Sequence, residues 1–256
     1  MDSASSGNNY TLQSRGNCVI AAVFDGKTGE VIVDNSLIGG SSPYGWDDIF
    51  DYGMFTNASD LNDFISKYQE NIDQNCVLDM HLDENTGSTS YDETDNNNDG
   101  TISGASWTTG ILGKCLNFDG SNDSIVVSDS ASLDITDTVT VTAWIKLDSL
   151  PSSGYDVIVS KVDSWWIVVE DDGQLVFDEM KHWADRIDSD AGSITAGVWT
   201  HIAAVYSDAG SYKALYINGK LVASSTTVNY GIEASNYDLT IGSYGTWNSF
   251  VDGMID

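Results

Sequence analysis

Residues 197–222 read GVWTHIAAVYSDAGSYKALYINGKLV. Three runs in or beside this stretch, 200–206, 213–217 and 220–224, are rich in β-branched, aromatic and other apolar residues. Runs of this composition and length are typical of β-strands. The last two are separated by Asn218-Gly219, a dipeptide that favours the tight turn of a β-hairpin. The stretch therefore predicts three consecutive antiparallel strands.

The same pattern extends over most of the chain. Val139 to Lys146 alternates apolar with polar residues, which predicts a strand with one buried face and one polar face. Turn dipeptides such as Asp119-Gly120 and Asp172-Gly173 separate other short apolar runs. Further strands are predicted at residues 115–118, 124–127, 156–160, 165–170, 174–177 and 239–241. An all-β, antiparallel sandwich is therefore predicted for residues 76–256.

The first 75 residues carry a different set of signals. Strand-like runs at 19–24 and 30–34 flank the turn Asp25–Gly29, which predicts a hairpin. Apolar residues at helical spacing follow a capping segment that starts at Asn57, and this predicts one short helix over residues 59–70. We therefore divide the chain into residues 1–75 and 76–256.

The charge balance excludes several classes of partner. The chain holds 39 acidic and 10 basic residues, a formal net charge of −29. Nucleic acid would be repelled, and an anionic membrane surface is disfavoured for the same reason. No apolar run approaches the ~20 residues of a membrane span, so membrane insertion is not expected. Two explanations of the acidity remain open, namely divalent cation binding and surroundings of high salt.

Five segments in chain order resemble the laminin-G-like, concanavalin A-like family of jelly-roll domains. They are residues 77–87, 113–127, 139–145, 197–206 and 213–222. The resemblance covers about two-thirds of the chain and implies a jelly-roll β-sandwich. It also implies an extracellular or surface location, although Met1 to Ala4 show neither the basic nor the apolar part of a secretory signal.

In this family the domain usually closes with a strand that follows a Gly-x-Ile-Asp run, which here is residues 253–256. A segment similar to the rest of that strand lies near the other end, comprising Asp47, Asp48, Ile49, Phe50, Asp51 and Tyr52. Residues 1–75 thus resemble the tail half of another such domain. Three accounts stay open: a permuted domain that closes on itself, a tandem array, and a strand that completes a neighbouring subunit.

The resemblance further implies a structural calcium ion that ties the Asp-Gly turn to the closing strand. The residues at the matching positions are Asp119, Asn122, Asp123 and Asp256. Carboxylate and carbonyl oxygens are the ligands that Ca²⁺ prefers. The alternative is that these Asp and Asn side chains stabilise turns through their own backbone.

Tryptophans supply candidate sugar contacts at Trp165, Trp166 and Trp183. Adjacent residues of a strand face opposite sides of the sheet, so we expect one of Trp165 and Trp166 to be buried and the other exposed. Glycosidases of this fold carry a Glu-x-Asp-x-Glu run on one strand. Neither Glu170-Asp171-Asp172 nor Asp178-Glu179 reproduces it, and no other catalytic arrangement is found, so an enzyme is not expected.

Two functions follow as expectations. The first is a non-enzymatic extracellular or surface protein for recognition or adhesion, which binds a glycan or a surface protein with calcium as structural support. The second is a structural subunit or repeat of an extracellular filament, sheath or virion fibre, assembled by strand completion between neighbours. The fold cannot choose between them, because this sandwich carries many functions.

Overall fold

In the computed structural model, the chain divides into two units, Met1–Cys76 and Val77–Asp256. The structure describes the backbone of three strands in the first unit, and residues 76–256 apart from 112, 181–184 and 245–246. Strands β1 (Asn9–Gln13), β2 (Val19–Phe24) and β3 (Val31–Val33) form an antiparallel sheet in the order β1-β2-β3. The antiparallel pairing predicted for the runs 19–24 and 30–34 is thereby confirmed for β2 and β3. The helix predicted over 59–70 and the segment from Asp47 to Tyr52 lie outside the described residues.

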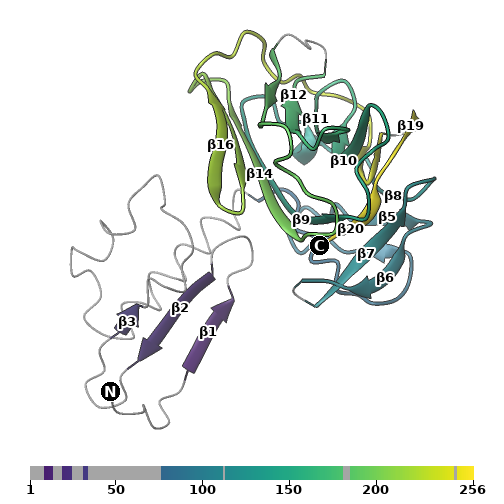
Figure 1. Cartoon of the computed structure of the whole chain (residues 1–256), viewed down its shortest axis with the longest axis vertical. Helices are drawn as coiled ribbons and strands as arrows, with labels where there is room; N and C mark the ends of the chain where they lie inside the picture. The colour runs from purple at the N-terminus through teal and green to yellow at the C-terminus, as the bar shows by residue number, and fades with distance from the viewer. Residues whose placement is uncertain are drawn as a thin grey trace. The chain divides into compact units, whose positions relative to one another are not determined.

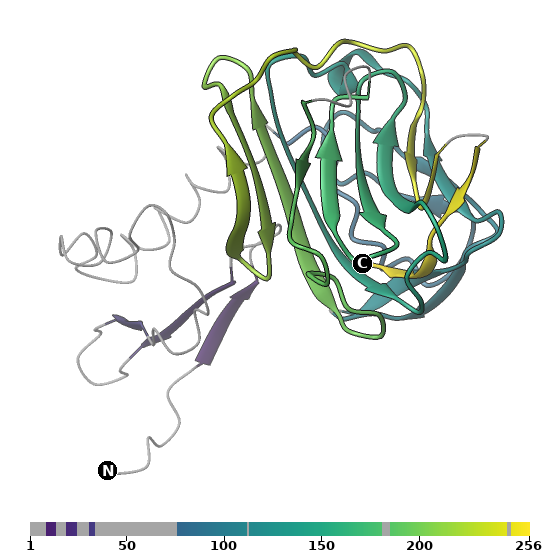
Figure 2. The same ribbon diagram turned by 45° about the horizontal axis from the view of Figure 1, so that its top comes forward.

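The second unit is a two-sheet antiparallel sandwich, as predicted (Figures 1 and 2). One sheet has eight strands in the order β13 (Ile187–Asp188), β12 (Leu175–Asp178), β11 (Trp165–Glu170), β10 (Tyr155–Lys161), β17 (Leu239–Ile241), β8 (Ser124–Val127), β5 (Gly100–Ser103) and β4 (Thr89–Ser90). The other has seven in the order β16 (Lys220–Ser225), β15 (Tyr212–Ile217), β14 (Thr200–Ser207), β9 (Thr138–Leu147), β20 (Asp252–Ile255), β7 (Lys114–Asp119) and β6 (Ser106–Thr109).

Two small elements complete this unit. A hairpin joins β18 (Ser243–Tyr244) to β19 (Trp247–Phe250). The one helical element in the described part of the chain is the 3₁₀ turn Ala131–Leu133. None of the described segments forms a helix that is long and apolar enough to span a bilayer.

The core lies between the two sheets and follows from the period of two along each strand. In β14, Thr200, Ile202, Ala204 and Tyr206 are buried, while the residues between them are partly exposed. Burying a large apolar side chain such as Ile202 stabilises the folded state by roughly 1.5–3 kcal/mol. Gly242 adopts φ 79° against the core residue Phe118, and a Cβ atom there would collide with the Phe118 ring. Glycine is therefore required at this position.

The strand β20 lies inside its sheet, between β7 and β9. It pairs with both, through Ile255 opposite Leu116 on one side and Ile145 on the other. The edge strands of this sheet are consequently β16 and β6. The domain limits predicted from the sequence, and the assembly of neighbours by strand completion, stay predictions.

Candidate functional site

The outer face of the eight-stranded sheet carries a second apolar cluster. Along β11, Trp165, Ile167 and Val169 belong to the core between the sheets, whereas Trp166 and Val168 lie on the opposite face. We call this second group the outer-face cluster. It consists of the buried residues Val157, Trp166, Val168 and Val176 with the partly buried Tyr155, Met180 and Tyr244 packed against them.

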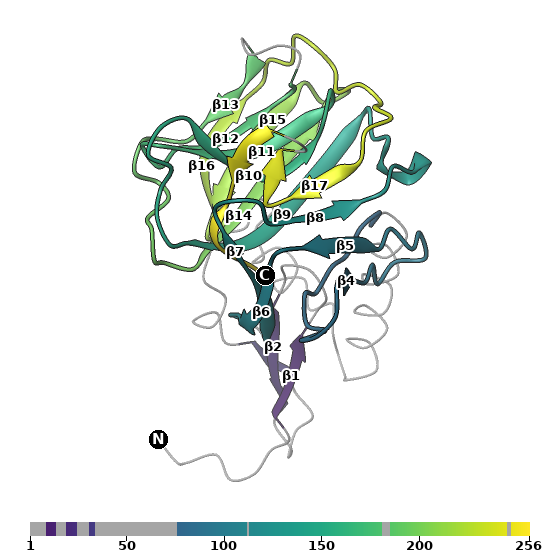
Figure 3. The same ribbon diagram turned by 90° about the vertical axis from the view of Figure 1, so that its right-hand side faces the viewer.

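The hairpin β18–β19 helps to cover this cluster. Both strands of this hairpin, which is yellow in Figure 3, lie against β10. The Ser249 hydroxyl also donates a hydrogen bond of 2.5 Å to the Tyr155 carbonyl oxygen. The Trp166 ring lies 4.8 Å from Tyr155 at 68° and 5.3 Å from Tyr244 at 59°, measured between ring centroids. Tilted and edge-on arrangements of this kind are favourable. Two tyrosine rings are thus held in place at the surface by one buried indole.

The sequence prediction for the tryptophans was wrong on exposure. Trp165 and Trp166 do face opposite sides of β11, but they are only 3% and 2% exposed. The reason is that the outer face of the sheet is itself covered by tyrosines and Met180. Trp183 lies outside the described residues. Tyr155 and Tyr244, both half-buried, therefore take the place at the surface that was expected of a tryptophan.

Carboxylates lie beside these rings on the same face. Asp178 is the register partner of Trp166, and Asp188 is the partner of Val176. Burial raises the pKa of Asp178, against the opposing effects of a hydrogen bond from Trp166 and of the charges of Arg186 and Lys213. Burial also raises the pKa of Asp188. Diagonal neighbours on adjacent strands are ~7–8 Å apart, so the two carboxylates share one small region.

Arg186 joins two of the surface carboxylates of this region. Its Nη1 lies 2.6 Å from Oε1 of Glu170, and its Nη2 lies 3.4 Å from Oε2 of the same side chain. Its Nε lies 2.9 Å from Oδ1 of Asp188. Bidentate pairing of a guanidinium with a carboxylate fixes orientation as well as charge. The region holds Glu170, Asp178 and Asp188 against one arginine, and is therefore net acidic.

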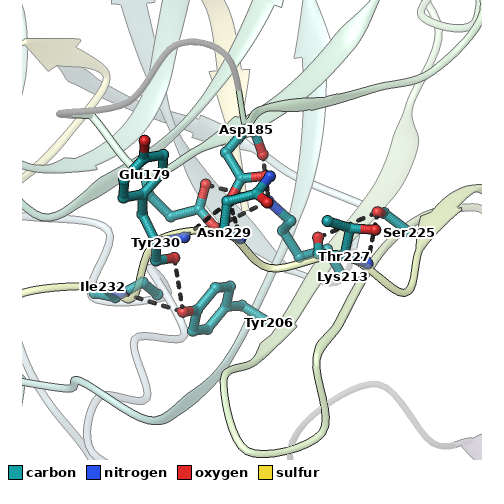
Figure 4. Close-up of polar contacts among 9 residues, drawn as sticks. All are labelled: Glu179, Asp185, Tyr206, Lys213, Ser225, Thr227, Asn229, Tyr230 and Ile232. Atoms are coloured by element: carbon teal, nitrogen blue, oxygen red, sulfur yellow. Dashed lines mark hydrogen bonds and ion pairs between the residues drawn. The ribbon is translucent and has the colours of Figure 1, made fainter.

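A buried ion network holds the chain segment that precedes Arg186 (Figure 4). Lys213 Nζ lies 3.1 Å from Oε1 of Glu179 and 3.1 Å from Oδ1 of Asp185, and it also donates to the Asp185 carbonyl oxygen. Asn229 donates to both carboxylate oxygens of Asp185, from its backbone N–H at 2.8 Å and from Nδ2 at 2.9 Å. Because Asp185 immediately precedes Arg186, this network fixes where the guanidinium emerges.

The four predicted calcium ligands do not come together. Oδ2 of Asp123 accepts the Asp119 backbone N–H at 2.9 Å, and Oδ1 of Asp119 accepts the Ser121 N–H at 2.9 Å. Oδ2 of Asp256 instead accepts the Ile111 N–H at 2.8 Å. The register places Asp252, not Asp256, opposite Asp119. The turn-stabilising alternative thus describes Asp119 and Asp123.

No group of three or more His, Cys, Asp or Glu side chains suited to a metal ion occurs among the described residues. The described geometry separates Asp256 from Asp119 and Asp123, and calcium binding stays a prediction. The signal that the sequence reading missed is the rise along a strand, ~3.3 Å per residue, which separates Asp252, the first residue of β20, from Asp256, the residue just after it.

Comparisons with known proteins agree with the fold. A family model described as the concanavalin A-like lectin/glucanases superfamily matches residues 119–256. No curated protein sequence matches the chain. The binding domain of Paraclostridial Mosquitocidal Protein 1 is similar, with a TM-score of 0.58 and 22% identity over 72% of this chain and 48% of that chain.

Two further structures show the same fold with ligands. Domain 4 of AbnA, a GH43 extracellular arabinanase from Geobacillus stearothermophilus in complex with arabinotriose, has a TM-score of 0.50 and 23% identity over 72% of this chain and 86% of that chain. The binding domain of botulinum neurotoxin DC in complex with SialylT has a TM-score of 0.53 and 14% identity over 72% of this chain and 47% of that chain. This chain matches about half the length of the two toxin structures.

Proposed function

Because this chain belongs to the concanavalin A-like lectin/glucanases superfamily, we propose that it binds glycans, without catalysing a reaction, at the outer face of its eight-stranded sheet. The observation that carries the proposal is the pair of half-buried rings, Tyr155 and Tyr244, fixed against the buried indole of Trp166. Ligand sites combine such apolar rings with a few fixed polar groups. Here Glu170 and Asp188 supply the polar groups as acceptors for sugar hydroxyls.

The relatives support a binding role in an extracellular setting. The AbnA domain belongs to an extracellular arabinanase and was solved with arabinotriose, and the neurotoxin domain was solved with SialylT. The two toxin structures are binding domains, while the superfamily as a whole includes glucanases. A glycan attached to a cell-surface protein would also be a suitable ligand, and binding it would give the protein a role in adhesion.

Burial argues against catalysis by the carboxylates of this face. Asp178 is 0% exposed, so its carboxyl group cannot reach a glycosidic oxygen unless the covering side chains move. Glu170 and Asp188 are both paired with Arg186. Glycoside hydrolysis needs two carboxyl groups that flank the scissile bond, whereas these two partly exposed carboxylates lie against one guanidinium, which lies between them.

Removing either surface ring should weaken glycan binding. We expect Tyr155→Ala and Tyr244→Ala each to raise the Kd about tenfold, which corresponds to about 1.4 kcal/mol, since aromatic anchors commonly contribute at least this much. A glycan array would identify the ligand, and isothermal titration calorimetry would measure the change. Melting curves of both variants would show that the fold is kept.

Tyr91 provides the matched control for this prediction. It is 54% exposed and follows β4, at the opposite edge of the same sheet. Tyr91→Ala should leave the Kd unchanged. A folded protein that binds no glycan on the array contradicts the proposed function, and so does a loss of affinity in Tyr91→Ala but in neither of the other two variants.

Calcium as structural support stays a proposal, separate from the four residues first assigned to it. If Ca²⁺ binds the folded state and not the unfolded state, calcium at a hundred times its Kd raises the free energy of unfolding by about 2.7 kcal/mol. A melting temperature that rises with calcium and returns with a chelator would support the proposal. Equal melting temperatures in calcium and in chelator would reject it.

A further inference from the structure

We infer that the outer face accepts glycans without carboxylate or sulfate groups, and that it discriminates against anionic glycans such as sialylated ones. This inference rests on the proposed function and adds the chemical class of the ligand to it. It depends on the charges around Tyr155 and Tyr244, on the pairing of the nearby cations, and on the net charge of the chain.

Carboxylates flank the two tyrosine rings on both sides. On one side are Glu170 and Asp188, whose side chains are 22% and 32% exposed. On the other side is Asp163, close enough to raise the pKa of the Tyr244 phenol after the larger effect of burial. An anionic ligand stacked on these rings would therefore meet like charge from both directions, and repulsion of this kind excludes wrong partners effectively.

The one arginine of this region already has its charge shared between two carboxylates. Nη1 and Nη2 of Arg186 donate to Glu170, and Nε pairs with Asp188. An incoming carboxylate would have either to bind at the remaining N–H of Nη1 or Nη2, beside two like charges, or to displace one of these partners. The displaced carboxylate would then lie beside the ligand, half-buried and unpaired, which is costly.

Two further described lysines are engaged as well. Lys213 is 1% exposed and lies between Glu179 and Asp185. Lys161 is 0% exposed, pairs with Asp129 and donates to the Tyr237 carbonyl oxygen at 2.6 Å. Neither ammonium group reaches the surface. The described part of the site thus offers acceptors for hydroxyl groups, and no unpaired cation.

The electrostatic field of the whole chain also disfavours anionic ligands. A net charge of −29 lowers the rate at which an anionic ligand approaches. This long-range part is screened within about 8 Å at physiological salt, whereas the contact part is screened much less. An uncharged sugar is subject to neither effect, because it carries no net charge, and its hydroxyl groups can donate to the carboxylates.

The test compares sialylated oligosaccharides with their enzymatically desialylated counterparts, alongside arabinotriose, on one array and then by calorimetry. We expect an uncharged glycan to bind and its sialylated counterpart to bind at least tenfold more weakly, with a smaller difference at high salt. Equal or tighter binding of the sialylated member would overturn the inference and leave the proposed function intact. Absence of binding to every glycan would overturn the proposed function itself, and the inference with it.

Glu170→Gln provides a sharper test, because it frees two nitrogens of Arg186 while Asp188 still orients the side chain. We expect this variant to bind the sialylated glycan about tenfold more tightly than the unaltered protein does. Asp137→Asn removes the same charge at an exposed position before β9 and should have no such effect. Asp188→Asn is the second variant if Glu170→Gln does not fold. Equal gains for Asp137→Asn and Glu170→Gln would show a general effect of net charge and overturn the role of the Arg186 pairing.

Discussion

Replacing Lys213 by methionine should lower the free energy of unfolding by about 3–5 kcal/mol, because removing one partner of a buried ion pair leaves the other charge uncompensated. Lys213 is 1% exposed, and Glu179 is also 1% exposed. Without the ammonium group, Glu179 and Asp185 would face each other in the interior as two carboxylates. Burial already raises the pKa of Glu179, and Lys213 is the strongest opposing influence. Urea denaturation followed by intrinsic tryptophan fluorescence would measure the loss.

Two companion variants distinguish the effect of breaking the buried ion pair from the effect of replacing any lysine by methionine. Lys220→Met alters an exposed lysine of the neighbouring strand β16 and should change stability by no more than about 0.5 kcal/mol. Lys213→Met combined with Glu179→Gln removes both charges and should recover part of the loss. A Lys213→Met protein as stable as the Lys220→Met protein would show that the network in Figure 4 does not hold the segment before Arg186.

The second large effect concerns pH and Asp156, at the start of β10. Asp156 is 7% exposed, and burial, together with the charge of Asp252, raises its pKa to about 7. An acid whose pKa is higher in the folded state holds its proton more tightly there. The stability that this group contributes is therefore present below pH about 4 and is lost as the pH rises through about 7. The shift corresponds to about 4 kcal/mol.

Asp156→Asn should abolish this pH dependence. Near pH 4 the variant and the unaltered protein should be about equally stable, and at pH 8 the variant should be more stable by up to about 4 kcal/mol. The comparison cancels the titration of other groups, since both proteins share them. Asp148→Asn, an exposed change after β9, serves as the control. A difference between variant and unaltered protein that is constant from pH 4 to pH 8 contradicts the assignment.

Much of the second unit could be predicted from the sequence, because its strands either alternate, as β14 does, or are short apolar runs bounded by turn residues, as β11 is. The strands predicted at 124–127, 165–170 and 239–241 have the bounds that were expected. The Asn218-Gly219 turn has both residues at positive φ, 51° and 73°, which is the geometry that this dipeptide favours. The shortest strands, β4, β13 and β18, carry too few residues to show a period.

The site was predicted less well because it depends on contacts between distant strands. Alternation places Asp178 on the face of Val176, but no pattern along the chain reveals that Arg186 bridges Glu170 and Asp188. The burial of Trp166 depends on Tyr244, which is 78 positions away and packs against the ring. The calcium ligands were assigned from a resemblance, and the register of β20 against β7 places Asp256 away from Asp119.

The most direct test of glycan binding at the outer face is a crystal structure of the protein with the tightest ligand from the array. The account predicts a sugar ring in van der Waals contact with Tyr155 or Tyr244, with its hydroxyl groups hydrogen-bonded to Glu170 or Asp188. A glycan bound at another surface, such as the Asp119–Asp123 turn, with Tyr155 and Tyr244 untouched, would contradict it.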